Sequence, residues 1–304
     1  MKRYLKKSVL GIFQLLFSIA LIFFSIYVFI HAYGITAYGI FSVISLFGNL
    51  TLLFNFGLNT ALLKFISGKE EVRSRNRHIT VSLLILTCST IVFTTILMLL
   101  QNSIVNDVLN TSPAFKNDVL LNYKIFLLAN FFMMLGQPFM VLIQAQSAFY
   151  IISIVQLIYT VLNWGGIIVL CQLNVPFKVI TLPGLVSAIA WFCLLLFLAR
   201  RKYGFRIAVF SSWMQFLSYV KRQLSYSRKA YINSLVNFCN GPLLKIIVIN
   251  YLGPQAAGSF DIILKIKAQL IALFTRVFEP LSSMLASRRS KEDLRNLVHC
   301  SEQL

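Results

Sequence analysis

The side chains in this chain that could do chemistry are charged and amide groups placed inside long apolar stretches. The apolar stretch near 258–286 carries four charged residues that share one helix face: Asp261, Lys265, Arg276 and Glu279. At about 100° per residue they fall within about 60° of one another. A charge inside hydrocarbon costs at least ~2.5–3.5 kcal/mol, so such side chains are expected to face a protein interior or a water-filled cavity.

Two interpretations of this charged face stay open. Asp261 and Lys265 are spaced i,i+4 and Arg276 and Glu279 are spaced i,i+3, so each pair could form an ion pair within the helix and serve structure alone. Alternatively, the face forms the cationic and hydrated wall of a pathway through the membrane.

Amides form similar stripes in other apolar stretches. Asn233, Asn237 and Asn240 lie within about 60° of one another on one helix face. Asn130, Gln137 and Gln144 repeat every seven residues, and Asn49 lies in the stretch at 38–66. Amides donate to and accept from hydroxyl groups, but they also bond neighbouring helices. Several such stripes in one chain predict a helical bundle with a polar centre. The candidate pathway residues are therefore Lys265, Arg276, Asp261, Glu279, Asn233, Asn237, Asn240, Asn130, Gln137 and Asn49.

Composition predicts that these stretches cross a membrane. The chain is 58% hydrophobic and 12% charged, against about 45–50% and about 25% in soluble domains. A transmembrane helix needs roughly 20 mostly apolar residues. Stretches long enough lie near 8–30, 38–66, 79–101, 119–145, 150–171, 179–199, 230–250 and 258–286. The sequence thus predicts an all-α polytopic membrane protein of about eight transmembrane helices.

The basic residues predict how the chain is oriented. The net charge of +19 comes mostly from Lys and Arg at 2–7, 69–77, 200–229 and 288–295. The alternate connections carry little charge, with Lys116 in one and Lys178 in another. This alternation follows the positive-inside rule, so both termini are expected in the cytoplasm. It also predicts contact with anionic membrane lipids and no role in binding nucleic acid.

Several other chemistries are not indicated. The five cysteines are scattered without a C-x-x-C pair, and there is no histidine cluster, so no metal site or cofactor is expected. The chain has no phosphate-binding G-x-x-x-x-G-K-[ST] motif. The longest outer connection, about 102–118, lacks clustered carboxylates for general acid or base catalysis, so we expect no enzyme and no catalytic residue. The first apolar stretch has no A-x-A-like cleavage site and is interpreted as a retained anchor.

An internal repeat organises the chain. Residues 34–41 and 253–260 both read G-x-x-A-x-G-x-F, 219 positions apart, and each lies in a turn between two apolar stretches. We expect a six-helix bundle at 1–199 and a basic amphipathic linker on the cytoplasmic surface at 200–229. Residues 230–304 then hold the first two helices and the cytoplasmic tail of a second bundle.

Three motifs carry a resemblance to a known family. They are the residues 37–41 (AYGIF), the residues 54–61 (FNFGLNTA) with Lys64, and the residues 251–260 (YLGPQAAGSF). With this layout the chain resembles the Wzx-type polysaccharide flippases of the multidrug/oligosaccharidyl-lipid/polysaccharide exporter superfamily. Members of that family usually have twelve or more spans, so the resemblance also implies a form truncated at its C-terminal side.

The resemblance implies a function and a location. Such a protein moves a lipid-linked oligosaccharide, an O-antigen or other surface polysaccharide unit on polyprenyl diphosphate, from the cytoplasmic to the outer leaflet of a bacterial inner membrane. The cationic face would then pass the diphosphate, and other polysaccharide assembly proteins would be partners. A small-molecule exporter of the same superfamily and an inactive remnant remain as alternatives.

Overall fold

The structure is a computed structural model that describes residues 2–46, 55–67, 71–108, 116–146 and 148–287. These residues are almost entirely helical, and none of them lies in a strand. Helices suit this composition because a backbone surrounded by hydrocarbon must satisfy its polar groups within its own segment. In chain order the elements are α1 (Lys2–Ile44), α3 (Leu58–Ile66), α4 (Val72–Leu99), α5 (Gln101–Ser103), η1 (Ile104–Val108), α6 (Lys116–Ala145), α7 (Phe149–Thr160), η3 (Val161–Gly165), α8 (Gly166–Gln172), η4 (Phe177–Val179), α9 (Leu182–Arg201), α10 (Trp213–Phe238), η5 (Cys239–Leu243) and α11 (Leu244–Ser287).

The prediction of a multi-pass membrane protein is confirmed. Five helical segments of the described residues are long and apolar enough to cross a membrane: Phe13–Ile44, Val72–Leu99, Lys116–Ala145, Phe149–Gln172 and Phe177–Arg201. They correspond to the first, third, fourth, fifth and sixth predicted spans. The predicted span at 38–66 lies partly outside the described residues, and those at 230–250 and 258–286 fall in α10, η5 and α11. The count of eight stays a prediction.

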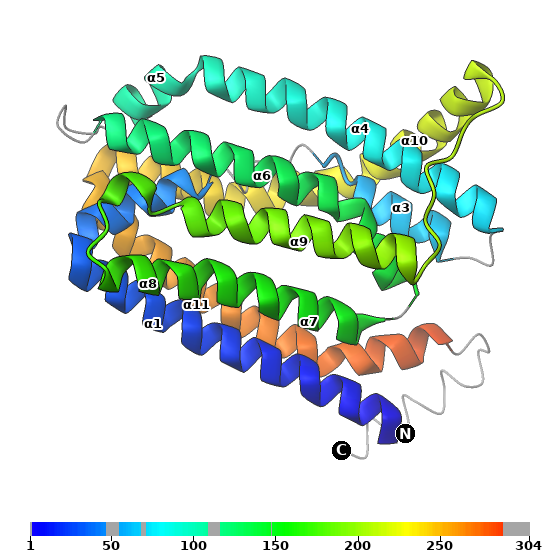
Figure 1. Cartoon of the computed structure of the whole chain (residues 1–304), viewed down its shortest axis with the longest axis horizontal. Coiled ribbons are helices and arrows are strands. Elements are labelled where there is room, and N and C mark those ends of the chain that lie inside the picture. Colours follow the sequence, from blue (N-terminus) through cyan, green and yellow to red (C-terminus); the bar gives the residue numbers. More distant parts are fainter. Residues whose placement is uncertain (1, 47–54, 68–70, 109–115, 147, 288–304) are drawn as a thin grey trace.

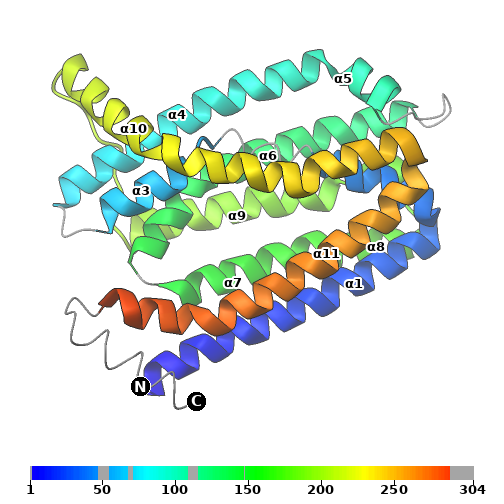
Figure 2. The ribbon, with the colours of Figure 1, turned by 180° about the vertical axis from the view of Figure 1, so that it is seen from behind.

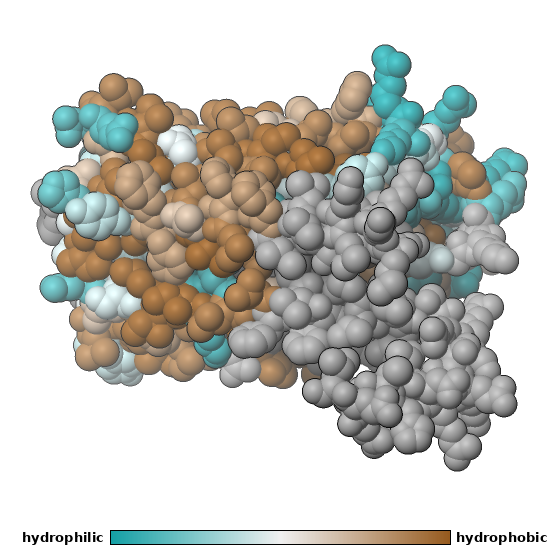
Figure 3. Space-filling view, turned by 90° about the horizontal axis from the view of Figure 1, so that it is seen from below, coloured by the Kyte–Doolittle hydropathy of each residue, from teal (hydrophilic) through white to brown (hydrophobic). Residues whose placement is uncertain are grey.

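The helices run side by side between the two ends of an elongated bundle (Figure 1). The start of α1, the start of α4 and the connection from α9 to α10 lie at one end. The bends of α1 and α11 lie at the other end, together with α5 and η4. Apolar side chains cover much of the described surface between the ends, and hydrophilic ones gather near the ends (Figure 3). This distribution is typical of a bundle embedded in a bilayer.

The linker region differs in detail from the boundaries that the sequence suggests. Ser212 caps α10 by accepting a hydrogen bond from the backbone N–H of Gln215 (3.2 Å). The helix then continues past residue 229 to Phe238 because no Gly or Pro interrupts it before Gly241 and Pro242. There it passes into the π-helical turn η5. The expected boundary at 229 therefore falls inside one helix.

The first half of α10 packs on α3 and α4. The buried amide of Gln223 donates to the backbone carbonyl of His78 (2.8 Å) and accepts from the hydroxyl of Ser82 (2.9 Å). The ring of His78 is stacked on Phe65, with 5.0 Å between the ring centroids. The hydrogen bonds of Gln223 therefore hold the first half of α10 against α4.

Candidate functional site

Two glycine bends, one in each copy of the repeat, position the candidate site. Gly34 bends α1 with φ 85° and ψ 162°, and Gly253 bends α11 with φ 82° and ψ 177°. Side chains disfavour this backbone region so strongly that it is essentially restricted to glycine. The first glycine of each repeated octapeptide therefore has nearly the same conformation, and each begins a new helical arm.

The two copies of the repeat meet at their second glycines. A Cβ atom on Gly39 would lie 1.8 Å from the carbonyl oxygen of Pro254, and one on Gly258 would lie 3.0 Å from the carbonyl oxygen of Ile35. The backbones of α1 and α11 are thus in direct contact, and the two helices lie side by side (Figure 2). This contact joins the first half of the chain to the second half.

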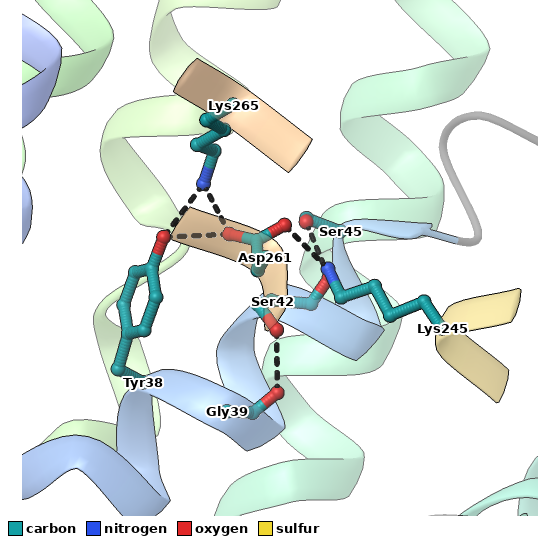
Figure 4. A network of polar contacts seen from close by, with 7 residues as sticks. All are labelled: Tyr38, Gly39, Ser42, Ser45, Lys245, Asp261 and Lys265. Atoms are coloured by element: carbon teal, nitrogen blue, oxygen red, sulfur yellow. Dashed lines mark hydrogen bonds and ion pairs between the residues drawn. The ribbon is translucent and has the colours of Figure 1, made fainter. Parts of the chain in front are cut away.

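A buried carboxylate lies beside this contact. Asp261 Oδ1 accepts from the ammonium of Lys245 (2.7 Å), and Asp261 Oδ2 accepts from the ammonium of Lys265 (2.6 Å) and the phenol of Tyr38 (2.6 Å). Lys265 also donates to the Tyr38 oxygen (2.8 Å), and Lys245 donates to the backbone carbonyl of Ser42. Figure 4 shows these groups converging from α1 and from both arms of α11. We call Tyr38, Lys245, Asp261 and Lys265 the lysine–aspartate cluster.

The members of the lysine–aspartate cluster differ in exposure. The side chain of Lys245 is 5% exposed and that of Asp261 is 9% exposed, whereas that of Lys265 is 23% exposed. Tyr38 is fully buried. Lys265 is therefore the most exposed charged member of the cluster.

The charges of this cluster do not balance. Two ammonium groups contact one carboxylate, which leaves one positive charge in excess within the cluster. An unmatched charge inside a membrane protein is costly, and such groups commonly mark substrate or ion pathways. The arrangement can accept an anionic group at Lys265 while Lys245 keeps Asp261 neutralised.

The structure brings together only some of the predicted pathway residues. The ion pair that the i,i+4 spacing of Asp261 and Lys265 allows is formed in the structure. Gln137 instead accepts a hydrogen bond from Asn59 (3.0 Å) between α6 and α3, which is a contact between helices. The amide nitrogen of Asn130 is buried without a hydrogen-bond partner among the described residues.

The remaining predicted pathway residues lie, whole or with their side chains, outside the described part of the chain. Asn49 lies outside the described residues. For five further pathway residues the structure describes the backbone, in α10, η5 and α11, and not the side chain: Asn233, Asn237, Asn240, Arg276 and Glu279.

Sequence reasoning missed two members of the cluster. Lys245 lies off the amide stripe of the stretch at 230–250. Tyr38 is part of the motif at residues 37–41, and nothing in that motif indicates a contact with a charged residue. One signal could have found Lys245: it lies eight residues before Gly253, and Asp261 lies eight residues after it. A hairpin that bends at Gly253 brings positions equally distant from the bend close to each other, so an opposite-charge pair at these positions can meet across the hairpin.

Comparisons of the chain with protein-family models, with curated proteins and with solved structures find no match.

Proposed function

We propose that this chain transports an anionic, lipid-linked oligosaccharide across a membrane, as the polysaccharide flippases that it resembles do. The observation that carries the proposal is the excess positive charge of the lysine–aspartate cluster, which is buried between the two repeat copies and accessible at Lys265. A diphosphate would supply the missing negative charge. The bent arms of α1 and α11 would supply two groups of helices that can move about their contact.

The proposal includes a membrane topology. Eight crossings with both termini in the cytoplasm would place the basic segments at 69–77 and 200–229 on the same side as the N-terminus. In support of this topology, the start of α1, the start of α4 and the connection from α9 to α10, which all carry basic residues, lie at the same end of the bundle (Figure 1). The proposed location is a bacterial inner membrane, with anionic lipids at the basic end and other polysaccharide assembly proteins as partners.

Export of cationic small molecules is less well supported by the geometry. Asp261, the acidic member of the cluster, already accepts hydrogen bonds from two ammonium groups and a phenol, so it offers no free carboxylate to a cation. A cationic ligand at Lys265 would meet repulsion between like charges.

A flipping assay tests the proposal. The full chain is reconstituted in vesicles containing undecaprenyl-diphosphate-linked N-acetylglucosamine with a fluorophore on the sugar, and dithionite added outside destroys the fluorophores that it reaches. Without transport about half of the fluorescence survives, because the probe occupies both leaflets. We expect the wild type to lose nearly all of it and Lys265→Gln to retain half.

Lys267→Gln is the matched control for this assay. Lys267 lies on the same helix two residues away and is exposed, outside the lysine–aspartate cluster. The Lys267→Gln variant should therefore flip the probe as the wild type does. If wild-type vesicles keep half of their fluorescence, transport by this chain is refuted, which is the result that the inactive-remnant alternative predicts. If both lysine variants lose the same share of fluorescence, the role of Lys265 is refuted.

A further inference from the structure

We propose that Lys265 and Trp164 form a subsite for a sugar attached directly to a diphosphate, in which the ammonium binds the diphosphate and the indole ring stacks on the sugar. This inference rests on the proposed transport function and names the part of the substrate that this site recognises.

The geometry around Lys265 places an aromatic ring beside the accessible charge. Its ammonium nitrogen lies 5.2 Å from the ring centroid of Trp164 and 5.2 Å from that of Tyr38. An ammonium group has three N–H donors, and hydrogen bonds to Asp261 and Tyr38 occupy two of them. One N–H makes no hydrogen bond among the described residues, and the ammonium lies over the indole ring, so an anion bound to it would lie beside that ring.

The local backbone holds Trp164 in place. Trp164 lies in the π-helical turn η3 between α7 and α8, and such turns inside helices are frequent at functional sites. The hydroxyl of Ser25 on α1 donates to the carbonyl oxygen of Trp164 (3.3 Å). Trp164 is partly buried, and the ammonium of Lys265 lies over its ring.

The depth of the subsite excludes an ordinary lipid headgroup as its ligand. Lys265 lies twelve residues beyond the bend at Gly253, which is about 18 Å along a helix. Taking the end of the bundle that carries the bend as one membrane surface, and a hydrocarbon core about 30 Å thick, we place Lys265 near the middle of the membrane. Headgroup phosphates of the bilayer lie at its surfaces, so an anion at Lys265 belongs to a molecule in transit.

The aromatic ring makes a sugar the expected neighbour of that anion. The face of an indole ring is electron-rich and attracts the C–H groups of a sugar's apolar face. A ligand with only a diphosphate and a lipid tail would leave this ring without that contact. The subsite should therefore distinguish a sugar-bearing diphosphate from a bare one.

Binding measurements on the purified full chain test this inference with three probes: inorganic pyrophosphate, farnesyl diphosphate, and farnesyl diphosphate linked to N-acetylglucosamine. The wild type should bind the sugar-bearing probe about tenfold more tightly than farnesyl diphosphate, the effect of one aromatic stacking contact. Trp164→Leu should bind both with equal affinity, and Trp164→Phe should keep part of the preference. Pyrophosphate should bind more weakly than either.

Each other outcome has a defined meaning. A sugar preference that survives in Trp164→Leu, or that is missing in the wild type, overturns the subsite while leaving the anion site intact. Pyrophosphate binding as tight as that of the sugar-bearing probe overturns the assignment of a lipid-linked ligand. If Lys265→Gln binds farnesyl diphosphate as well as Lys267→Gln does, the proposed anion site itself fails. Thermal unfolding of each variant shows whether it is folded.

Discussion

Substituting Gly39 by alanine should push apart the two helices that join the halves of the chain. The new Cβ would lie 1.8 Å from the carbonyl oxygen of Pro254, whereas real Cβ contacts are essentially never shorter than 3.0 Å. The helices must therefore separate by roughly 1.2 Å, the difference between those distances. The clashing atom is part of the backbone and cannot rotate away. We expect a loss of unfolding free energy near the upper end of the ~1–3 kcal/mol typical of overpacking.

Two other glycines make this prediction a graded series. A Cβ on Gly258 would lie 3.0 Å from the carbonyl oxygen of Ile35, so Gly258→Ala should cost less than Gly39→Ala. Gly165 has a helical backbone and open space around its Cβ position, so Gly165→Ala should be neutral or stabilise by up to ~1 kcal/mol.

Unfolding of the purified variants by added dodecyl sulfate in mixed micelles measures the order. Helical circular dichroism is followed against the mole fraction of dodecyl sulfate. We expect the midpoint to fall from Gly165→Ala to Gly258→Ala to Gly39→Ala. Equal midpoints for the Gly39 and Gly165 variants would refute a direct backbone contact between the two repeat copies.

Three further substitutions can be followed by the same unfolding measurement. Asp261→Asn leaves two ammonium groups without their carboxylate and should lower the unfolding free energy by about 3–5 kcal/mol. Adding Lys245→Met should recover part of this loss, and no recovery would argue against the ion pair between Lys245 and Asp261. Gly136→Ala places a Cβ 2.2 Å from the Trp191 ring and should lower the unfolding free energy by about 1–3 kcal/mol. Adding Trp191→Phe should restore part of this loss, and no restoration would contradict the packing of Gly136 on Trp191. Gly34→Ala must adopt φ 85° and should cost about 1–3 kcal/mol; an unchanged midpoint would count against the bend.

Much of the fold can be predicted from the sequence because membrane helices depend on local composition. Length and hydrophobicity alone locate the five described helical segments that are long and apolar enough to cross a membrane. The glycine bends can also be predicted, since each lies in a short turn between two apolar stretches. The basic residues at 200–229 predict a surface helix and do not determine where α10 ends. Its end near Phe238 is predicted only when Gly241 and Pro242, further along the chain, are considered with them.

The candidate site is harder to predict because it depends on contacts between distant segments. The i,i+4 pair of Asp261 and Lys265 follows from helix periodicity. The hydrogen bond from Tyr38 joins residues 223 positions apart, and no local pattern specifies it. For Gln137 the spacing predicts a polar helix face, and its carbonyl oxygen accepts a hydrogen bond from Asn59 on α3. A polar stripe shows which face of a helix is polar, and it does not show whether that face meets water or another helix.

Comparison of equivalent positions in the two repeat copies explains why the site is asymmetric. With an offset of 219 residues, Asp261 corresponds to Ser42, Lys265 to Leu46, and Lys245 to Ile26. All the charges of the cluster thus belong to the second copy, whereas the first copy contributes the Tyr38 phenol and the Ser42 carbonyl. If both copies carried the charges, two carboxylates and four ammonium groups would crowd around the contact between Gly39 and Gly258, and like charges would repel one another. Retaining the glycines in both copies while placing the charges in one keeps the close helix contact and leaves a single anion site beside it.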